Sequence, residues 1–326
     1  MSEFDLIDRL RQIICTRPGS VSPRCVVGIG DDGAVLDVPA DRHLVVCTDT
    51  LVEGVHFPAS TEPAAVGHKA LAVNLSDLAA MGARPAWFFM ALTLPSENPG
   101  WLDSFALGMA RLATDAAIEL AGGDVTSGPL SVTVTALGWV EKGRALLRSG
   151  AKEGDLVVVS GRPGAAARAL QDLKMGMEPD ASDRNCLDFP VPRLQLGLSL
   201  HGLATACIDI SDGLGADLGH LIEQSGVGAE IRLEKLPVPA SLESLDEKQR
   251  LPLQISGGDD YELCFTIPVS SEASLAGIAA ACDVELTVIG TITPRSGLIF
   301  KTADGRIYKP TRDGYRHFDD RETVNT

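Results

Sequence analysis

The chain has 326 residues, of which 45% are hydrophobic and 22% are charged, values typical of a globular protein and not of a disordered or fibrous one. Its 28 Lys and Arg residues stand against 44 Asp and Glu residues, which gives a formal net charge of −16 at pH 7. The composition therefore disfavours binding to nucleic acid or to an anionic membrane surface, because both need clustered basic side chains.

The N-terminal segment MSEFDLIDRLRQII predicts an amphipathic helix with Phe4, Ile7, Leu10 and Ile14 on one side. Acidic residues stand where a signal peptide carries positive charge. The longest apolar run, at 86–94, spans nine residues, whereas a membrane-crossing helix needs roughly 20. We therefore expect a cytoplasmic protein without a membrane segment.

Alternating and β-branched runs predict strands, and segments with an apolar period of 3.6 residues predict helices. Several strands precede the first long helix, so the order favours an α+β fold over a doubly wound parallel sheet. In chain order, strands are expected at 25–29, 43–48, 86–94, 131–140, 155–160, 206–210, 262–267 and 285–292, and helices near 64–81, 101–121, 164–174, 193–204 and 213–224.

Two segments are polar and interrupt the predicted elements. GRALLRSGAKEGD at 143–155 separates two strand runs and is the expected junction between two domains, 1–145 and 146–326. MGMEPDASDRNC at 175–186 is expected to be a mobile loop. The seven cysteines are odd in number and never spaced as CxxC, which disfavours a disulfide framework and a zinc ribbon.

The segment GIGDDG at 28–33 matches the G-x-G-x-x-G dinucleotide pattern and follows a predicted strand. The chain after it is short and ends at Pro39, so the helix that would receive a pyrophosphate is not expected. The two carboxylates of the loop would also repel a phosphate, by about 4 kcal/mol for each unscreened contact at about 4 Å. A phosphate is therefore expected here only through a cation.

Five acidic clusters lie at predicted element ends, where glycines let the backbone approach a ligand. Each alone has an ordinary explanation; Asp212, for example, would be a sound helix cap. Mg²⁺ is coordinated by carboxylates, water and phosphate oxygens. Together the clusters therefore favour phosphoryl transfer assisted by more than one Mg²⁺ ion. The clusters are Thr48-Asp49-Thr50 at a strand end, Asn74 with Asp77 on one helix face, Gly122-Gly123-Asp124 at a helix end, Asp209 to Gly213, and Gly257 to Asp260.

The motifs resemble those of the thiamine-monophosphate kinase family, which is part of the aminoimidazole-ribonucleotide-synthetase-like superfamily. The resemblance extends over about residues 28–318. The resemblance implies a two-domain α+β fold, with an N-terminal strand-rich dimerisation domain and a C-terminal α/β-sandwich domain. It also implies a homodimer that holds ATP and Mg²⁺ in the cleft between subunits. The matching segments are GIGDDGAVLD, CTDTLVEGVHF, KALAVNLSDLAAMGARP, GGDVTSGP, ALLRSGAKEGD, IDISDGLGADLGH, SGGDDYELCF and GYRHF.

The resemblance also implies roles for individual residues. Cys47 stands where family members often have serine, and Asp259 where they often have glutamate, which shortens that carboxylate by one methylene. The implied metal positions are Asp32, Thr48, Asp49, Asp77, Asp124, Asp209 and Asp212; the implied ATP contacts are Gly123, Asp124, Arg148 and Ser211; the implied substrate contacts are His56, Asp259 and Tyr315.

The implied reaction is the ATP-dependent phosphorylation of thiamine monophosphate to thiamine diphosphate, with release of ADP. A phosphate monoester has its second pKa near 6 and is largely ionised at pH 7, so the acceptor oxygen needs no general base. Positioning and charge neutralisation then carry the rate, with no catalytic acid or base among the side chains. Arg148 offers a fork of donors to phosphate, and the thiazolium cation is expected near Asp259 or the ring of Tyr315.

Three alternatives stay open. A superfamily relative would use ATP to activate a different oxygen, although the cysteines that selenophosphate synthesis and hydrogenase maturation need are not in the expected settings. A non-catalytic acidic module would bind divalent cations without releasing ADP. The turn SGRPG at 160–164 is either a second anion site at a helix N-terminus or, more simply, a tight strand-to-helix turn.

Overall fold

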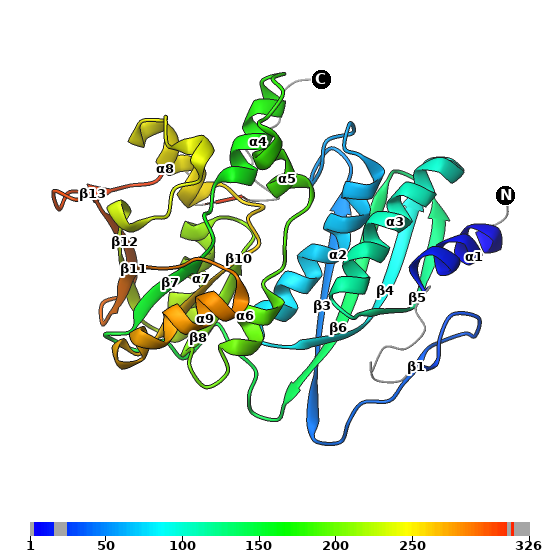
Figure 1. Cartoon of the computed structure of the whole chain (residues 1–326), viewed down its shortest axis with the longest axis horizontal. Coiled ribbons are helices and arrows are strands. Elements are labelled where there is room, and N and C mark those ends of the chain that lie inside the picture. Colours follow the sequence, from blue (N-terminus) through cyan, green and yellow to red (C-terminus); the bar gives the residue numbers. More distant parts are fainter. Residues whose placement is uncertain (1–2, 16–24, 312–313, 316–326) are drawn as a thin grey trace. The chain divides into compact units, whose positions relative to one another are not determined.

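The structure is a computed structural model that describes residues 3–15, 25–311 and 314–315 (Figure 1). The chain divides into two compact units, each described by itself below. Unit 1 comprises Met1–Leu146 and Asp188–Gly202, and unit 2 comprises Leu147–Leu187 and Leu203–Thr326. The first change of unit thus falls inside the segment 143–155, and the segment Asp188–Gly202 returns to unit 1. The simpler division into 1–145 and 146–326 stays a prediction.

Unit 1 is built on a four-stranded sheet with α2 and α3 on one face (Figure 1). All neighbouring strands are antiparallel except β4 and β5, which are parallel. A separate antiparallel pair joins β1 (Cys25–Val27) to β2 (Val35–Leu36). The sheet order is β3 (Arg42–Val52), β6 (Ser131–Glu141), β4 (Arg84–Leu94) and β5 (Glu119–Ser127), and the helices of the unit are α1 (Glu3–Ile14), α2 (Pro63–Ala80), α3 (Pro99–Asp115) and α6 (Leu194–Ser199).

Helix α2 is buried on nearly all sides, because it packs on the sheet, on α3 and on α6. Two glycines allow the backbones of α2 and α3 to touch: a Cβ on Gly108 would lie 1.9 Å from the carbonyl oxygen of Ala64, and one on Gly67 would lie 2.1 Å from that of Phe105. The strand residues Trp87 and Phe88 are completely buried. The helix that carries Asp77 is therefore held rigidly.

The other face of this sheet carries exposed side chains from β3. Successive side chains of a strand point to opposite faces, and Val46, Thr48 and Thr50 share the face away from the helices. The hydroxyl groups of Thr48 and Thr135 lie 3.0 Å apart on this face. Val46 is 54% exposed. Unit 1 thus presents an open, partly apolar strand surface.

Unit 2 is built on a seven-stranded sheet in which every neighbouring pair is antiparallel except β9 and β12. Helix α7 packs against β8, β9, β10 and β12, and α9 packs against β11. The sheet order is β13 (Ile307–Tyr308), β12 (Gly297–Lys301), β9 (Gly228–Arg232), β11 (Leu286–Thr293), β7 (Leu156–Ser160), β10 (Glu262–Ile267) and β8 (Ala206–Ile210), and the helices are α4 (Ala165–Lys174), α5 (Ala181–Asp188), α7 (Leu214–Ser225), α8 (Glu247–Ser256) and α9 (Leu275–Cys282).

Most predicted elements are confirmed, and three predictions are wrong in detail. The helix expected to 121 ends at Asp115, because Ala117 adopts a positive φ of 52° and the chain enters β5. The expected mobile loop at 175–186 contains the start of α5, where Asp180 caps the helix through Ser182. The helix expected at 193–204 is shorter, α6 ending at Ser199.

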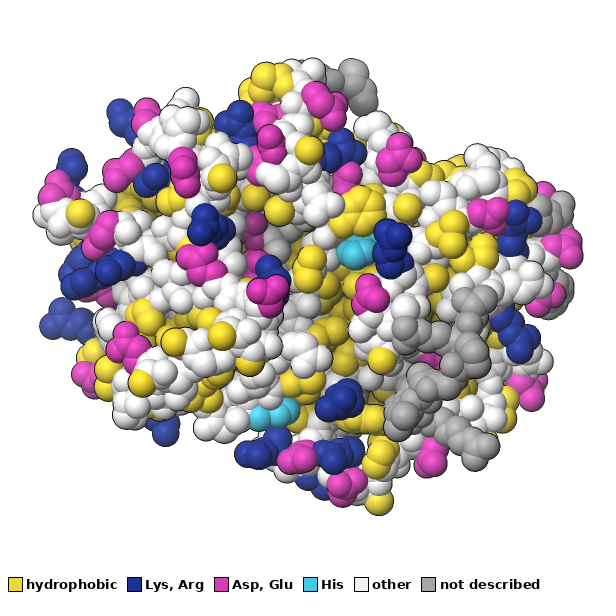
Figure 2. Space-filling view, in the orientation of Figure 1, with side chains coloured by type: hydrophobic (Ala, Val, Ile, Leu, Met, Phe, Trp, Pro, Cys, Tyr) yellow, Lys and Arg dark blue, Asp and Glu magenta, His cyan; other side chains and the backbone are white. Residues whose placement is uncertain are grey.

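No helix within the described residues is both long and apolar enough to cross a membrane. On the face of the molecule in Figure 2, basic and acidic side chains are interspersed over both halves of the view.

His68 of α2 gives unit 1 a pH-dependent contact. Its Nε2 donates to the carbonyl oxygen of Pro190 at 2.8 Å, and its ring meets that of Phe189 edge-on. Burial lowers the pKa of His68 from its usual 6.5, so the folded chain binds this proton less tightly than the unfolded chain does. The contribution of His68 to stability is therefore complete above about pH 6.5 and is lost as the pH falls through the lowered pKa.

The variant His68→Gln tests this contact, because an amide keeps a donor for Pro190 and does not titrate. We expect the melting temperature of the unsubstituted chain to fall relative to that of the variant between about pH 7.5 and about pH 5. Thermal melts followed by circular dichroism over this range measure the difference. Parallel pH profiles of the two proteins would contradict the prediction.

Candidate functional site

Strand β3 and helix α2 bring two of the predicted metal residues together in unit 1. The carboxyl group of Asp49 makes a side-chain hydrogen bond with that of Asp77. Burial raises the pKa of Asp49, and this hydrogen bond opposes the shift. Two carboxyl groups this close need a proton or a cation between them. The pair therefore fits a divalent metal ion.

The thiol of Cys47 lies beside this pair of carboxyl groups. Its Sγ lies 3.3 Å from the carbonyl oxygen of Asn74. Burial, followed by the charges of Asp77 and Asp49, raises the pKa of the thiol well above its usual range. Cys47 is thus a neutral neighbour of the carboxyl pair and not a thiolate ligand.

Thr48 occupies the opposite face of β3 from Asp49. Its hydroxyl group pairs with that of Thr135 on the exposed face of the sheet. The side chain is therefore directed away from Asp77. The sequence prediction named Thr48 without this orientation, in which its hydroxyl group does not meet the pair Asp49 and Asp77.

Gly123 and Asp124 lie inside β5, which corrects the prediction that Gly122-Gly123-Asp124 ends a helix. Gly123 pairs with Met90 of β4, and a Cβ there would lie 2.0 Å from the Met90 carbonyl oxygen. The pairing of β4 with β5 therefore requires glycine at position 123. A cavity of about 40 Å³ adjoins it, lined by apolar side chains that include Ile7, Leu10 and Val125.

Asp32 lies in the turn that follows β1, and it is exposed. Its backbone N–H donates to the side chain of Asp31 at 3.0 Å. Strand β2 comes next in the chain, so the helix of a dinucleotide-binding motif is absent from this described segment, as the sequence indicates. The loop offers carboxylates and no helix N-terminus.

His56 lies in a tight turn after β3. Its Nδ1 accepts the backbone N–H of Val52 at 3.0 Å. In the neutral imidazole the proton is then on Nε2, which is a donor. His56 is therefore suited to donate to an oxygen atom of a substrate.

In unit 2, the loop between β8 and α7 carries two of the predicted residues, Ser211 and Asp212, while Asp209 lies inside β8. A residue that the sequence analysis did not single out holds this loop. Oδ2 of Asp217 accepts the backbone N–H groups of Ser211, Asp212 and Gly213 at 3.0, 3.0 and 3.1 Å. Burial, followed by the charges of Asp209 and Asp212, raises the pKa of Asp217 to about 7. The N-cap position of α7 is occupied by Gly213, so the prediction of Asp212 as the helix cap is wrong, and Asp217 binds the loop that precedes the helix.

The segment Gly257–Tyr261 packs against this loop in a strained conformation. Asp259 and Tyr261 both have positive φ angles, 69° and 50°, which non-glycine residues rarely adopt. The N–H of Asp259 donates to the carbonyl oxygen of Ser211 at 2.9 Å, and that of Tyr261 donates to Ile210 at 2.8 Å. The Tyr261 hydroxyl donates to Oδ1 of Asp259 at 3.1 Å. These bonds fix the Asp259 carboxylate.

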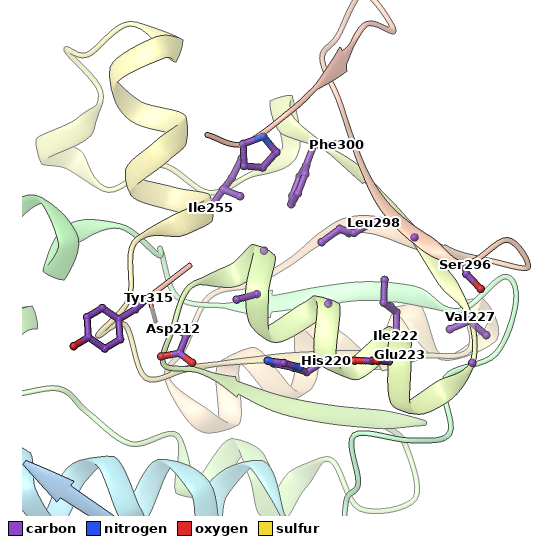
Figure 3. A pocket seen from close by; sticks show the side chains of 16 residues that line it. Asp212, His220, Ile222, Glu223, Val227, Ile255, Ser296, Leu298, Phe300 and Tyr315 are labelled. Carbon is purple, nitrogen blue, oxygen red and sulfur yellow. The ribbon is translucent and has the colours of Figure 1, made fainter. Parts of the chain in front are cut away.

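A cavity of about 810 Å³ runs along α7, with Asp212 and Tyr315 at one end (Figure 3). The N–H of Tyr315 donates to the carbonyl oxygen of Asp212 at 3.0 Å. Apolar side chains, among them Ile222 and Phe300, line the cavity together with His220 and Glu223. Apolar walls with a carboxylate and an aromatic ring at the mouth suit an organic cation.

The turn at 160–164 is a strand-to-helix turn and not an anion site. Gly164 has a φ of 113°, and its N–H donates to Oδ1 of Asp260 at 2.8 Å. A carboxylate of the chain itself therefore occupies the N-terminus of α4. Burial raises the pKa of Asp260 well above its usual range.

Arg148 is exposed at the start of unit 2, where its carbonyl oxygen accepts the hydroxyl of Ser225 at 3.1 Å. Across the described residues, no group of three or more His, Cys, Asp and Glu side chains is arranged to hold a metal ion. The predicted metal residues Asp32, Thr48, Asp49, Asp77 and Asp124 belong to unit 1, and Asp209 and Asp212 belong to unit 2.

Two family models match the chain: AIR synthase related protein, N-terminal domain, at residues 30–140, and AIR synthase related protein, C-terminal domain, at residues 152–302. The chain is 45% identical to the thiamine-monophosphate kinase of Escherichia coli over 299 residues, which cover 90% of this chain and 92% of that protein.

Solved structures are similar over nearly the whole length. The crystal structure of thiamine-monophosphate kinase from Stenotrophomonas maltophilia is 44% identical, with a TM-score of 0.84 over 92% of this chain and 96% of that chain. AaThiL complexed with AMPPCP and TMP is 32% identical, with a TM-score of 0.76 over 97% of both chains.

Proposed function

Because the chain belongs to the thiamine-monophosphate kinase family of AIR synthase related proteins, we propose that the carboxylates and loops described above carry the reaction of that family. The chain transfers the γ-phosphoryl group of ATP to thiamine monophosphate, which gives thiamine diphosphate and ADP. It is a phosphotransferase whose acceptor is itself a phosphate group.

Acceptor chemistry explains why no catalytic base is needed. The second pKa of a phosphate monoester is near 6, so its oxygen is largely ionised at pH 7 and attacks the γ-phosphorus directly. The side chains then have to align two polyanions whose charges repel each other. We propose that His56 donates through Nε2 to an oxygen atom of thiamine monophosphate. Arg148 is proposed to donate through its guanidinium group to phosphate oxygens of ATP.

The observation that carries the metal proposal is the hydrogen-bonded pair Asp49 and Asp77. Mg²⁺, when bound, neutralises the charge of the polyphosphate and aligns its oxygens. The proposed ligands in unit 1 are carboxylates and the Thr48 carbonyl. Those in unit 2 are one carboxylate inside β8 and one in the loop after it. They are Asp32, Thr48, Asp49, Asp77 and Asp124 in unit 1, and Asp209 and Asp212 in unit 2.

The remaining contacts divide between nucleotide and substrate. We assign Gly123, Asp124, Arg148 and Ser211 to ATP, because they stand at the motif positions that the family resemblance identifies with the nucleotide. Asp259, Tyr315 and His56 are assigned to thiamine monophosphate. The strained segment that fixes Asp259 supports this assignment, because strain persists where geometry matters.

We further propose a homodimer formed through the open face of the unit 1 sheet. Support comes from the exposed side chains of β3, including Val46, on a face that the helices of unit 1 leave uncovered. The cytoplasmic location expected from the sequence stays a prediction.

A coupled ADP-release assay tests the function. We expect ADP to appear only when ATP, thiamine monophosphate and Mg²⁺ are all present, and thiamine without its phosphate to be no acceptor. A non-catalytic acidic module would bind Mg²⁺ and release no ADP, which would overturn the proposal.

Removal of divalent metal is expected to abolish ADP release, because the repulsion between the two polyanions and the carboxylates is then uncompensated. Dialysis against EDTA followed by titration with Mg²⁺ measures this dependence. Circular dichroism of the dialysed protein serves as the control for folding. Full activity after dialysis would contradict the metal assignment.

A further inference from the structure

We propose that Asp217 is a positioning residue for the phosphoryl transfer, because its buried carboxyl group holds a loop to which proposed nucleotide-binding and substrate-binding residues are both attached. The inference rests on the proposed function for the roles of those residues. Asp217 itself lies in the first turn of α7 and is not assigned a contact with ATP or with thiamine monophosphate.

The N–H side of the loop is directed at a single atom. Three consecutive N–H groups, those of Ser211, Asp212 and Gly213, converge on Oδ2 of Asp217 within 3.1 Å. The Asp217 residue is only 4% exposed, so water competes little for these bonds. Above about pH 7, where Asp217 is mainly ionised, hydrogen bonds from N–H groups to its carboxylate are about twice as strong as those between neutral groups. The loop is therefore anchored from α7.

The carbonyl side of the same loop holds the proposed substrate contacts. The Ser211 carbonyl oxygen accepts the N–H of Asp259 at 2.9 Å, and the Asp212 carbonyl oxygen accepts the N–H of Tyr315 at 3.0 Å. Each of these bonds joins a segment distant in sequence to one peptide of the loop. A displacement of the loop therefore moves Ser211 and Asp212 together with Asp259 and Tyr315.

Close contacts leave the loop little room to adopt another conformation. A Cβ on Gly213 would lie 3.0 Å from the carbonyl oxygen of Gly257, and one on Gly258 would lie 2.4 Å from that of Ser211. Gly213 also has a φ of 123°. The two segments thus fit only in the arrangement that Asp217 holds.

Occupation of the N–H groups by Asp217 has a chemical consequence for ligand binding. Consecutive N–H groups before a helix usually form an anion site. Here a carboxylate of the chain fills that site, so the loop presents carbonyl oxygens and the Ser211 and Asp212 side chains instead. A loop of this kind favours a cation-bridged phosphate over a directly bound one.

The test compares Asp217→Ala and Asp217→Asn with the same changes at Asp155. Asp155 is a matched control in unit 2: it is 5% exposed, and its Oδ2 accepts the N–H of Lys152 at 2.9 Å and the hydroxyl of Thr205 at 2.6 Å. Amide hydrogen exchange of the peptide 209–213 and kcat/KM for each substrate are measured in all variants.

For Asp217→Ala we expect faster exchange at Ser211 to Gly213 and kcat/KM for both substrates about 10²-fold lower, the cost of a misplaced site. Asp217→Asn keeps an acceptor oxygen without the charge, so about a 10-fold loss is expected. Both Asp155 variants are expected to lose a similar amount of stability and to keep kcat/KM within about 2-fold of the unsubstituted chain.

Unchanged protection of the three amides in the Asp217 variants, or activity losses matched by the Asp155 variants, would overturn the positioning role. If Asp217→Ala does not fold, the exchange rates and kcat/KM values of Asp217→Asn test the positioning role in its place. Failure of the unsubstituted chain to release ADP would overturn the proposed function instead, and the exchange rates would still decide whether Asp217 holds the loop.

Discussion

Replacing Asp49 or Asp77 by asparagine is expected to reduce kcat/KM for phosphoryl transfer by about 10³-fold, without unfolding the chain. Each change removes one negative charge from a proposed metal site whose ligands are mainly carboxylates. Asp124→Asn is expected to have the same effect on activity. The ADP-release assay and a thermal melt, each with and without Mg²⁺, measure the two quantities.

The stability of the Asp49 variant carries further information. Because burial raises the pKa of Asp49, the folded chain binds its proton more tightly than the unfolded chain does. Without metal, the stability contributed by Asp49 is therefore lost as the pH rises from about 3.8 through the raised pKa. Asp49→Asn is expected to remove this loss and to be as stable as the unsubstituted chain at pH 7, or more so.

Asp37→Asn is the control, because Asp37 is an exposed carboxylate of unit 1 between β2 and β3. It is expected to retain activity and the melting temperature. Substantial activity in the variants at 49, 77 and 124 would remove the metal assignment from these residues.

The second large effect is expected for Gly123→Ala. The new methyl group would lie 2.0 Å from the carbonyl oxygen of Met90, so β4 and β5 would have to separate next to Asp124. We expect a loss of about 1–3 kcal/mol in the free energy of unfolding and weaker ATP binding. Urea denaturation and calorimetric titration with a non-hydrolysable ATP analogue measure these changes.

Gly277→Ala in α9 is the matched control, since a Cβ there has no atom within 4 Å. Alanine in a helix interior is favoured over glycine by about 0.8–1 kcal/mol, so this variant is expected to be slightly more stable and to bind ATP normally. ATP affinity in Gly123→Ala equal to that of the control would show that the tight strand pairing is irrelevant to the nucleotide.

Much of the fold follows from local sequence patterns. The buried strand at 206–210 is confirmed because four of its five residues are apolar, with Asp209 as the exception, and α7 is confirmed because its period is regular. Gly122 and Gly123 misled the prediction, since glycine pairs usually mark turns. Here the second glycine is required by the Met90 carbonyl oxygen of another strand, and no local pattern contains that contact.

The site could be predicted as a set of residue types but not as an arrangement. The spacing of Asn74 and Asp77 indicated a shared helix face, whereas the approach of Asp49 to Asp77 depends on how β3 and α2 pack. Asp217 was missed because an acidic residue in a first helical turn is common. Only the three converging N–H groups distinguish it.

The positive φ angles of Asp259 and Tyr261 have a consequence for evolution in the laboratory. Each such residue costs of order 1 kcal/mol of conformational energy that glycine would not incur. A selection for heat resistance alone would therefore accept glycine at 259 but not at 261, because Tyr261 is buried and the cavity left by its ring would cost more than the relieved strain. Glycine at 259 would also remove the carboxylate that accepts the Tyr261 hydroxyl and is assigned to the substrate, so heat-resistant clones from this segment would be poorer enzymes.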